Sequence, residues 1–113
     1  MTNKFGVVRQ VAYVVKDMDV ALKYWTEFLN AGPFFMFRHS QMDDQKYRGG
    51  ESNVDVSLAV GNSGDVQIEL IQCENDAPSV YKEFLDAGRV GVHHVGLMPE
   101  NYDSAWQDYE SMG

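Results

Sequence analysis

The chain has 113 residues, of which 44% are hydrophobic and 23% are charged, a composition typical of one globular domain. Seventeen acidic residues against nine basic ones give a net charge of -8, which argues against nucleic acids and anionic membranes as partners, because both require a basic surface. The single cysteine, Cys73, excludes an intrachain disulfide, and no apolar run has the length of a signal peptide or a membrane span. These features predict a reduced, cytoplasmic protein.

The region up to Gln72 predicts a strand, a helix and three further strands. Val7–Val15 is rich in valine and favours a strand. Asp17 or Asp19 provides the N-cap of a helix that ends near Asn30, before a glycine and a proline. A polar loop over 41–53 and a glycine-rich hairpin over 61–65 separate the three further strands, which are Phe34–Arg38, Val54–Val60 and Val66–Gln72.

The remainder of the chain predicts a linking helix and a second copy of the first strand and helix. Pro78 suits the start of the linking helix, which ends near Gly88. A shift of 84 positions aligns Gln10 with His94 and Trp25 with Tyr109 without a gap. The expected order is therefore β-α-β-β-β, a linking helix and β-α. A four-stranded sheet with one helix on its apolar face would leave the other face free for a site.

Three polar side chains, Gln10, Glu69 and His94, come from three different predicted strands. The two-residue period places Gln10 and Glu69 on the less apolar face of their strands, where a carboxylate requires solvent, a partner or a metal. Taken singly, they have ordinary interpretations, namely a polar strand residue, a solvated carboxylate and a structural histidine. Their place in a repeated unit favours a joint site. His93 is expected on the opposite face, in packing or at the surface.

Three segments carry a family resemblance: Q-V-A-Y-V-V-K-D (Gln10–Asp17), V-Q-I-E-L-I-Q (Val66–Gln72) and G-V-H-H-V-G-L (Gly91–Leu97). They resemble the vicinal oxygen chelate superfamily, which contains glyoxalase I, methylmalonyl-CoA epimerase, extradiol dioxygenases and bleomycin-resistance proteins. The resemblance implies an α+β fold, with a single glyoxalase-like domain over 1–113. This domain would comprise a βαβββ module over 7–72, the linking helix over 78–88, and the first strand and helix of a second module over 90–113.

Carried over by position, the resemblance makes Gln10, Glu69 and His94 the ligands of a divalent metal and Glu69 the catalytic base. A glutamine first ligand resembles glyoxalase I, whereas the H-H-V-G-L segment resembles the epimerase branch more. The implied reaction is proton transfer alpha to a carbonyl, of lyase or isomerase type, on a substrate with adjacent oxygens. Oxygen and nitrogen ligands without a thiolate allow Zn, Ni, Co, Mn or Fe.

Four further polar residues are candidates for holding an anionic group of the substrate: Arg38, His39, Tyr47 and Arg48. Solvated charges at loops and strand ends would give the same pattern. The alternative function is a metal-free small-molecule-binding protein of the bleomycin-resistance type, in which Trp25, Trp106 and the aromatic residues of 34–37 would line a cleft, although the helical spacing of both tryptophans favours the core.

The family's fourth ligand, a glutamate on the last strand of a second module, has no counterpart in the sequence up to Gly113. This departure suggests a longer chain, a site completed by another subunit, or an inactive form. An apolar strand with few partners and an apolar helix face both require a covering surface. We therefore predict a homodimer or a longer protein, with Gly91–Met98 against another module's first strand. A monomer whose second unit packs back on the first is the alternative.

Overall fold

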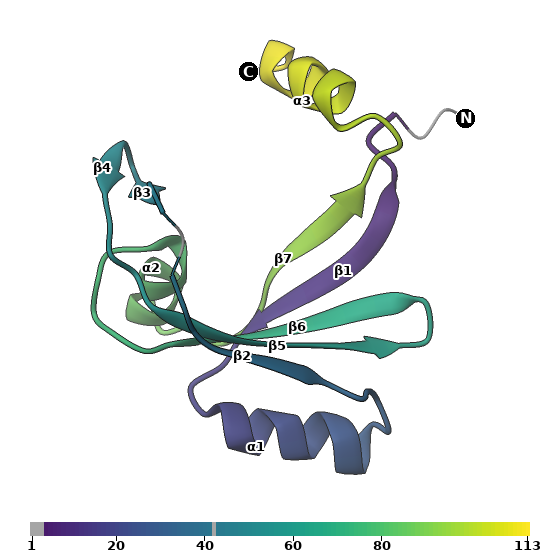
Figure 1. Cartoon of the computed structure of the whole chain (residues 1–113), viewed down its shortest axis with the longest axis vertical. Helices are drawn as coiled ribbons and strands as arrows, with labels where there is room; N and C mark the ends of the chain where they lie inside the picture. The colour runs from purple at the N-terminus through teal and green to yellow at the C-terminus, as the bar shows by residue number, and fades with distance from the viewer. Residues whose placement is uncertain (1–3, 42) are drawn as a thin grey trace.

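A curved five-stranded sheet in the order β2-β5-β6-β1-β7 organises the molecule (Figure 1). This computed structural model describes residues 4–41 and 43–113. The five strands are β1 (Val7–Val14), β2 (Phe35–Ser40), β5 (Val56–Ser63), β6 (Val66–Cys73) and β7 (Gly91–Met98). β1 pairs in parallel with β6 and antiparallel with β7, so it joins the first unit of the chain to the second.

The helices and the small hairpin complete the predicted α+β architecture. They are α1 (Met18–Lys23), continued by the π-helix η1 (Tyr24–Phe28), then β3 (Lys46–Tyr47), β4 (Gly50–Glu51), α2 (Val80–Asp86) and α3 (Tyr102–Ser111). The order β1-α1-β2-β5-β6 confirms the βαβββ module, and β7-α3 confirms the strand and helix of a second module. No helix in the described ranges is both long enough and apolar enough to cross a membrane.

The polar stretch 41–53 was expected to be a loop, but it contains the hairpin of β3 and β4. The prediction was wrong because contacts with a distant helix accompany this hairpin. Tyr47 Oη donates a hydrogen bond to Glu83 of α2 at 2.5 Å, and Arg48 Nη2 lies 2.6 Å from the same carboxylate. Met42 belongs to this stretch and lies outside the described residues.

One face of the sheet is covered by α1 and η1. Met18 of α1 is buried against Leu70 of β6. Trp25 of η1 packs edge-on against Tyr13 of β1, with ring centroids 5.1 Å apart. Burial of these apolar side chains is the main term that holds a short helix to a sheet.

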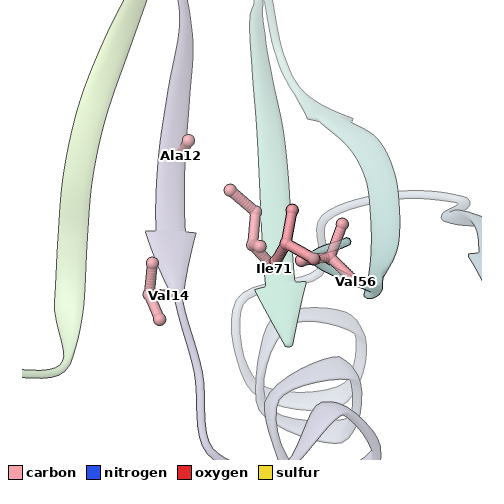
Figure 2. Close-up of a cluster of buried hydrophobic side chains, with 5 residues drawn as sticks. Ala12, Val14, Val56 and Ile71 are labelled. Atoms are coloured by element: carbon pink, nitrogen blue, oxygen red, sulfur yellow. The ribbon is translucent and has the colours of Figure 1, made fainter. Parts of the chain in front are cut away.

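The other face was predicted to be free, but α2 covers one end of it. Val14, Val56 and Ile71 form a buried cluster there (Figure 2). Tyr81 and Phe84 of α2 pack against this cluster. The sequence prediction assigned one apolar face to the sheet, whereas both faces are apolar at this end. The uncovered part of the second face is the region beside this cluster, toward Glu69 and Gln10.

The N-caps of the two repeated helices lie at equivalent positions. Asp17 accepts a hydrogen bond from the backbone N–H of Val20, and Asn101, 84 positions later, accepts one from Ser104. α2 begins later than predicted, since Ser79 caps it by accepting from the Lys82 N–H at 2.9 Å, so that Pro78 lies outside the helix. Side-chain oxygens satisfy the unpaired amides of a first turn, which explains why each helix begins where it does.

β7 does lie against a first strand, but it is this chain's own β1. This pairing is the one expected for the monomer alternative. α3, however, does not pack back on the first module: it lies beyond the end of β7, away from α1 (Figure 1). Of the residues of α3, Ala105 is buried. The large apolar side chains that α3 exposes are Tyr102, Trp106 and Tyr109.

Candidate functional site

The register of the central strands brings Gln10, Glu69 and His94 onto one face of the sheet. Ala12 of β1 is paired with Glu69 of β6 on one side and with His94 of β7 on the other, while Gln10 is paired with Gln67. Paired residues on neighbouring strands point to the same side of a sheet. The three predicted ligands therefore share the face opposite α1. The small side chain of Ala12 leaves space for Glu69 and His94 to approach each other above it.

Glu69 and His94 face each other without a direct hydrogen bond. Glu69 Oε1 lies 3.8 Å from His94 Nε2, with side chains 17% and 37% exposed. This separation exceeds hydrogen-bond length. Burial raises the pKa of the Glu69 carboxyl. Burial, assisted by the neighbouring His93, lowers the pKa of His94, so its imidazole is neutral at pH 7.

A chain of hydrogen bonds through His93 determines which nitrogen of His94 carries the proton. His93 Nε2 lies 3.2 Å from the carbonyl oxygen of Val80, which can only accept, so this nitrogen is the donor. The Nδ1 of a neutral His93 is then an acceptor, and it lies 2.9 Å from Nδ1 of His94, which donates to it. With this assignment the lone pair of His94 is on Nε2, the atom that lies 3.8 Å from Glu69 Oε1.

The expectation that His93 faces away from His94 is wrong. The pairing of β1 with β7 passes from Ala12–His94 to Tyr13–Val92, so His93 is an extra residue in a β-bulge. A bulge interrupts the alternation on which the expectation depended. The predicted role in packing holds, because the His93 ring lies 5.0 Å from that of Phe84.

Gln67 and Gly96 are site residues that the sequence analysis did not identify. Gln10 Nε2 donates to Gln67 Oε1 at 2.7 Å, which leaves Gln10 Oε1 available as a ligand. Gly96 is paired with Gln10, and a Cβ at this position would lie 2.9 Å from Gln10 Oε1. Glycine therefore gives the Gln10 amide its space. The two-residue period already placed Gln67 on the face of Glu69, so this signal was present in the sequence.

The four candidates for substrate binding lie in other contacts. Arg38 is 3.9 Å from Asp19, near the α1 side of the sheet. His39 Nδ1 is 2.7 Å from Asp55 Oδ2, and the hydrogen bond to Asp55 raises the His39 pKa. Tyr47 and Arg48 contact Glu83, as described above. Among the contacts of the described residues, none links these four side chains to Glu69 or His94, and their role stays a prediction.

The Glu69–His94 pair fits a divalent metal. Metal–nitrogen and metal–oxygen bonds of about 2.0–2.2 Å require two ligands of one ion to lie within about 4.4 Å of each other. The 3.8 Å separation satisfies this limit, and both facing atoms carry lone pairs. Within residues 4–41 and 43–113, no group of three or more histidine, cysteine, aspartate or glutamate residues is placed to hold a metal. A third ligand on this face would therefore be an amide oxygen, as Gln10 offers.

The fold is that of a known class of proteins. The family model of the glyoxalase/bleomycin resistance protein/dioxygenase superfamily matches residues 9–113, so the chain belongs to this superfamily. No curated protein matches the chain.

Among solved structures, a methylmalonyl-CoA epimerase from Mycobacterium tuberculosis is similar over 100% of this chain and 69% of its own, with 20% identity and a TM-score of 0.70. A hypothetical protein from Bacillus halodurans is 16% identical over 95% of this chain and 68% of its own, with a TM-score of 0.69. A Streptomyces coelicolor methylmalonyl-CoA epimerase in complex with 2-nitronate-propionyl-CoA is 16% identical over 96% and 71%, with a TM-score of 0.66. These similarities show a shared fold.

Proposed function

We propose that this chain carries the metal-binding part of a glyoxalase- or epimerase-like enzyme that transfers a proton alpha to a carbonyl. One observation carries the proposal: a carboxylate oxygen of Glu69 and the Nε2 atom of His94 face each other at 3.8 Å on the sheet face opposite α1. Two lone pairs in this arrangement repel each other unless a cation or a water lies between them. Membership of the superfamily, and the fold shared with methylmalonyl-CoA epimerases, support the isomerase type.

In this proposal Gln10, Glu69 and His94 hold a divalent ion, of Zn, Ni, Co, Mn or Fe. Such an ion, when bound, polarises adjacent oxygens of a carbonyl substrate and acidifies the neighbouring C–H. Glu69 accepts the proton. Because its pKa is raised by burial, its carboxylate is a stronger base than an exposed one. His94, kept neutral and in one tautomer by His93, contributes a ligand atom without adding positive charge.

A second copy of the chain remains the predicted partner. A homodimer would cover α3 and provide further groups for the open site, in keeping with the prediction from the sequence. Sedimentation of the purified chain at micromolar concentration tests this part alone, since the ligand set described above lies within one copy.

Metal uptake is the first test. We expect Glu69→Ala and His94→Ala to lose zinc binding in calorimetric titrations. His39→Ala and Glu110→Ala are the matched controls, because both residues lie in exposed positions away from the pair, and they should retain it. Equal zinc affinity in all four variants would remove the site.

The His93 bridge gives a second, sharper test. Loss of a group that orients a metal ligand typically costs 10–100-fold in metal affinity, and we expect about this loss for His93→Ala. His93→Gln restores an acceptor for the His94 N–H and should recover part of the affinity. Nitrogen chemical shifts of His94 report its tautomer directly. An unchanged tautomer in His93→Ala would exclude the bridge while leaving the ligand set in place.

Turnover is the third test. Solvent deuterium should enter the carbon next to the carbonyl of an accepted substrate, and a chelator should stop the exchange. Binding of a small molecule that a chelator does not affect, without exchange, would instead support the metal-free binding protein of the bleomycin-resistance type.

A further inference from the structure

The face that carries the Glu69–His94 pair is divided into a polar part and an apolar part. The strand registers place Phe35, Val60, Glu69, Ala12 and His94 side by side, in this order, in a row across all five strands. Glu69 therefore has His94 beyond Ala12 on one side. On its other side lie two apolar residues, first Val60 on β5 and then Phe35 on β2.

The apolar part consists of four side chains that point to the site face. Met36 of β2 packs in the cluster under α1, so Phe35 and Phe37 point to the opposite face, where they are 65% and 53% exposed. Leu58 of β5 packs at the edge of the cluster under α2, on the site face, and Val60 lies two residues further along. We call these four residues, Phe35, Phe37, Leu58 and Val60, the β2–β5 strip.

The strip is continuous with the ligand pair and carries no charge. Two exposed phenylalanines on one face of an edge strand form an apolar surface that water covers unfavourably. α2 packs on the neighbouring end of the same face, over Val56 and Ile71, whereas at the other end Phe35 is exposed and Val60 is half-buried. Strands are spaced about 4.8 Å apart, so the strip begins one strand from Glu69 and extends to about 10 Å from it.

We propose that the β2–β5 strip binds the hydrocarbon part of a ligand whose adjacent oxygens lie at the Glu69–His94 pair. The ligand class is then a carbonyl compound with an alkyl or aryl group that spans about two strand spacings, rather than a small, wholly polar acid. The inference rests on the proposed function, because the pair fixes the oxygen end of the ligand. The strip determines the direction in which the rest of the ligand extends.

Alkyl hydroxamates test the proposal, because each has two adjacent oxygens and a tail of chosen length. Zinc-loaded protein is titrated calorimetrically with acetohydroxamate, butyrohydroxamate, hexanohydroxamate and octanohydroxamate. Complete burial of a methylene is worth about fourfold in affinity, and on this open strip we expect about twofold per methylene, up to a plateau. Phe35→Ser and Val60→Ser should flatten this dependence and leave acetohydroxamate binding unchanged. Phe28→Ser, at an exposed phenylalanine of η1, is the matched control and should keep the wild-type dependence.

The possible outcomes separate the strip from the metal site. If the affinity of the wild type does not depend on tail length, or if both strip variants keep the wild-type dependence, the proposal for the strip is wrong. The proposal for the metal site is then unaffected. Failure of acetohydroxamate itself to bind overturns the Glu69–His94 site, and the strip with it. If Phe35→Ser lowers the sedimenting mass and leaves the tail dependence unchanged, the strip is a contact between copies and the proposal is wrong.

Discussion

β1–α1 and β7–α3 have the same local design, but only the first helix covers a sheet. Both helices are capped by a side-chain oxygen at equivalent positions, Asp17 and Asn101. In the first unit Met18 is buried and Trp25 packs on Tyr13. In the second unit the apolar side chains of α3 remain largely exposed, including Trp106. A cap and an amphipathic pattern therefore determine where a helix begins, whereas its burial depends on a sheet face next to it.

The candidate site lies between the two units and does not depend on this difference. β1 and β7 pair directly, so Glu69 and His94 meet across β1 without any contribution from α3. The one strand of the second unit, β7, brings His94 to the candidate site, while its helix α3 lies beyond the end of this strand (Figure 1). Variants at equivalent positions of the two units can test this division of roles.

The largest expected difference is between the two tryptophans. Trp25→Ala removes a ring that packs on Tyr13 and on the cluster under α1, and we expect the free energy of unfolding to fall by about 3 kcal/mol. Trp106 is half exposed, so Trp106→Ala should cost less than about 1 kcal/mol. Urea unfolding followed by circular dichroism measures both. Equal losses would mean that α3 is as firmly packed as α1.

The two N-caps provide a smaller difference. Loss of an N-cap costs about 1 kcal/mol. Asp17→Ala should lower the global free energy of unfolding by this amount, because α1 is part of the core. Asn101→Ala should speed amide hydrogen exchange within α3 and leave the global unfolding midpoint in place. Serine at either position keeps a capping oxygen and serves as the control. A shift of the global midpoint by Asn101→Ala would show that α3 unfolds together with the sheet.

Gly96 and Ala12 are equivalent positions in the two strands, and Gly96→Ala gives the second strand the residue of the first. The new Cβ would lie 2.9 Å from Gln10 Oε1, so we expect the Gln10 amide to move and its hydrogen bond to Gln67 to weaken. Alanine stabilises a strand relative to glycine by about 0.5–1 kcal/mol, which offsets the crowding and leaves the net stability nearly unchanged. The side-chain amide signal of Gln10 in NMR spectra is the readout. An unmoved signal would contradict the tight fit.

The smallest expected effect is on the pH dependence of stability. The lowered pKa of His94 makes the folded state bind fewer protons, so stability rises as pH increases through the folded pKa toward the ordinary value of 6.5. The raised pKa of Glu69 acts in the opposite direction: its contribution is present below the ordinary value of 4.5 and is lost as pH rises through the folded pKa. His94→Gln introduces the residue found at the equivalent position of the first unit, Gln10. This variant should lose the rise in stability that the wild type shows as the pH increases toward 6.5. Urea unfolding midpoints measured at several pH values will show whether the rise in stability from His94 and the fall from Glu69 occur in separate pH ranges.

Strands β1, β6 and β7 could be predicted closely, because valine-rich and alternating segments with few turn residues leave little choice of structure. The shared face of Gln10, Glu69 and His94 followed from the same alternation and from the family resemblance. The hairpin of β3 and β4 could not be predicted, because it depends on contacts with Glu83, more than 30 residues away. The orientation of His93 was missed because nothing in the local sequence marks a bulge. The coverage of the second face by α2 is likewise a tertiary effect.

The parallel pairing of β1 with β6 also governs when the site can form during folding. Gln10 and Gln67 are 57 residues apart, and parallel strands can meet only after a long crossover has closed. The hairpin of β5 and β6 is local and can form early, whereas docking β1 onto β6 closes the longest loop in the first unit and is slow. Glu69 and His94, on opposite sides of β1, are brought together only by this late step. The Glu69–His94 pair therefore exists only in a chain whose β1 has docked between β6 and β7.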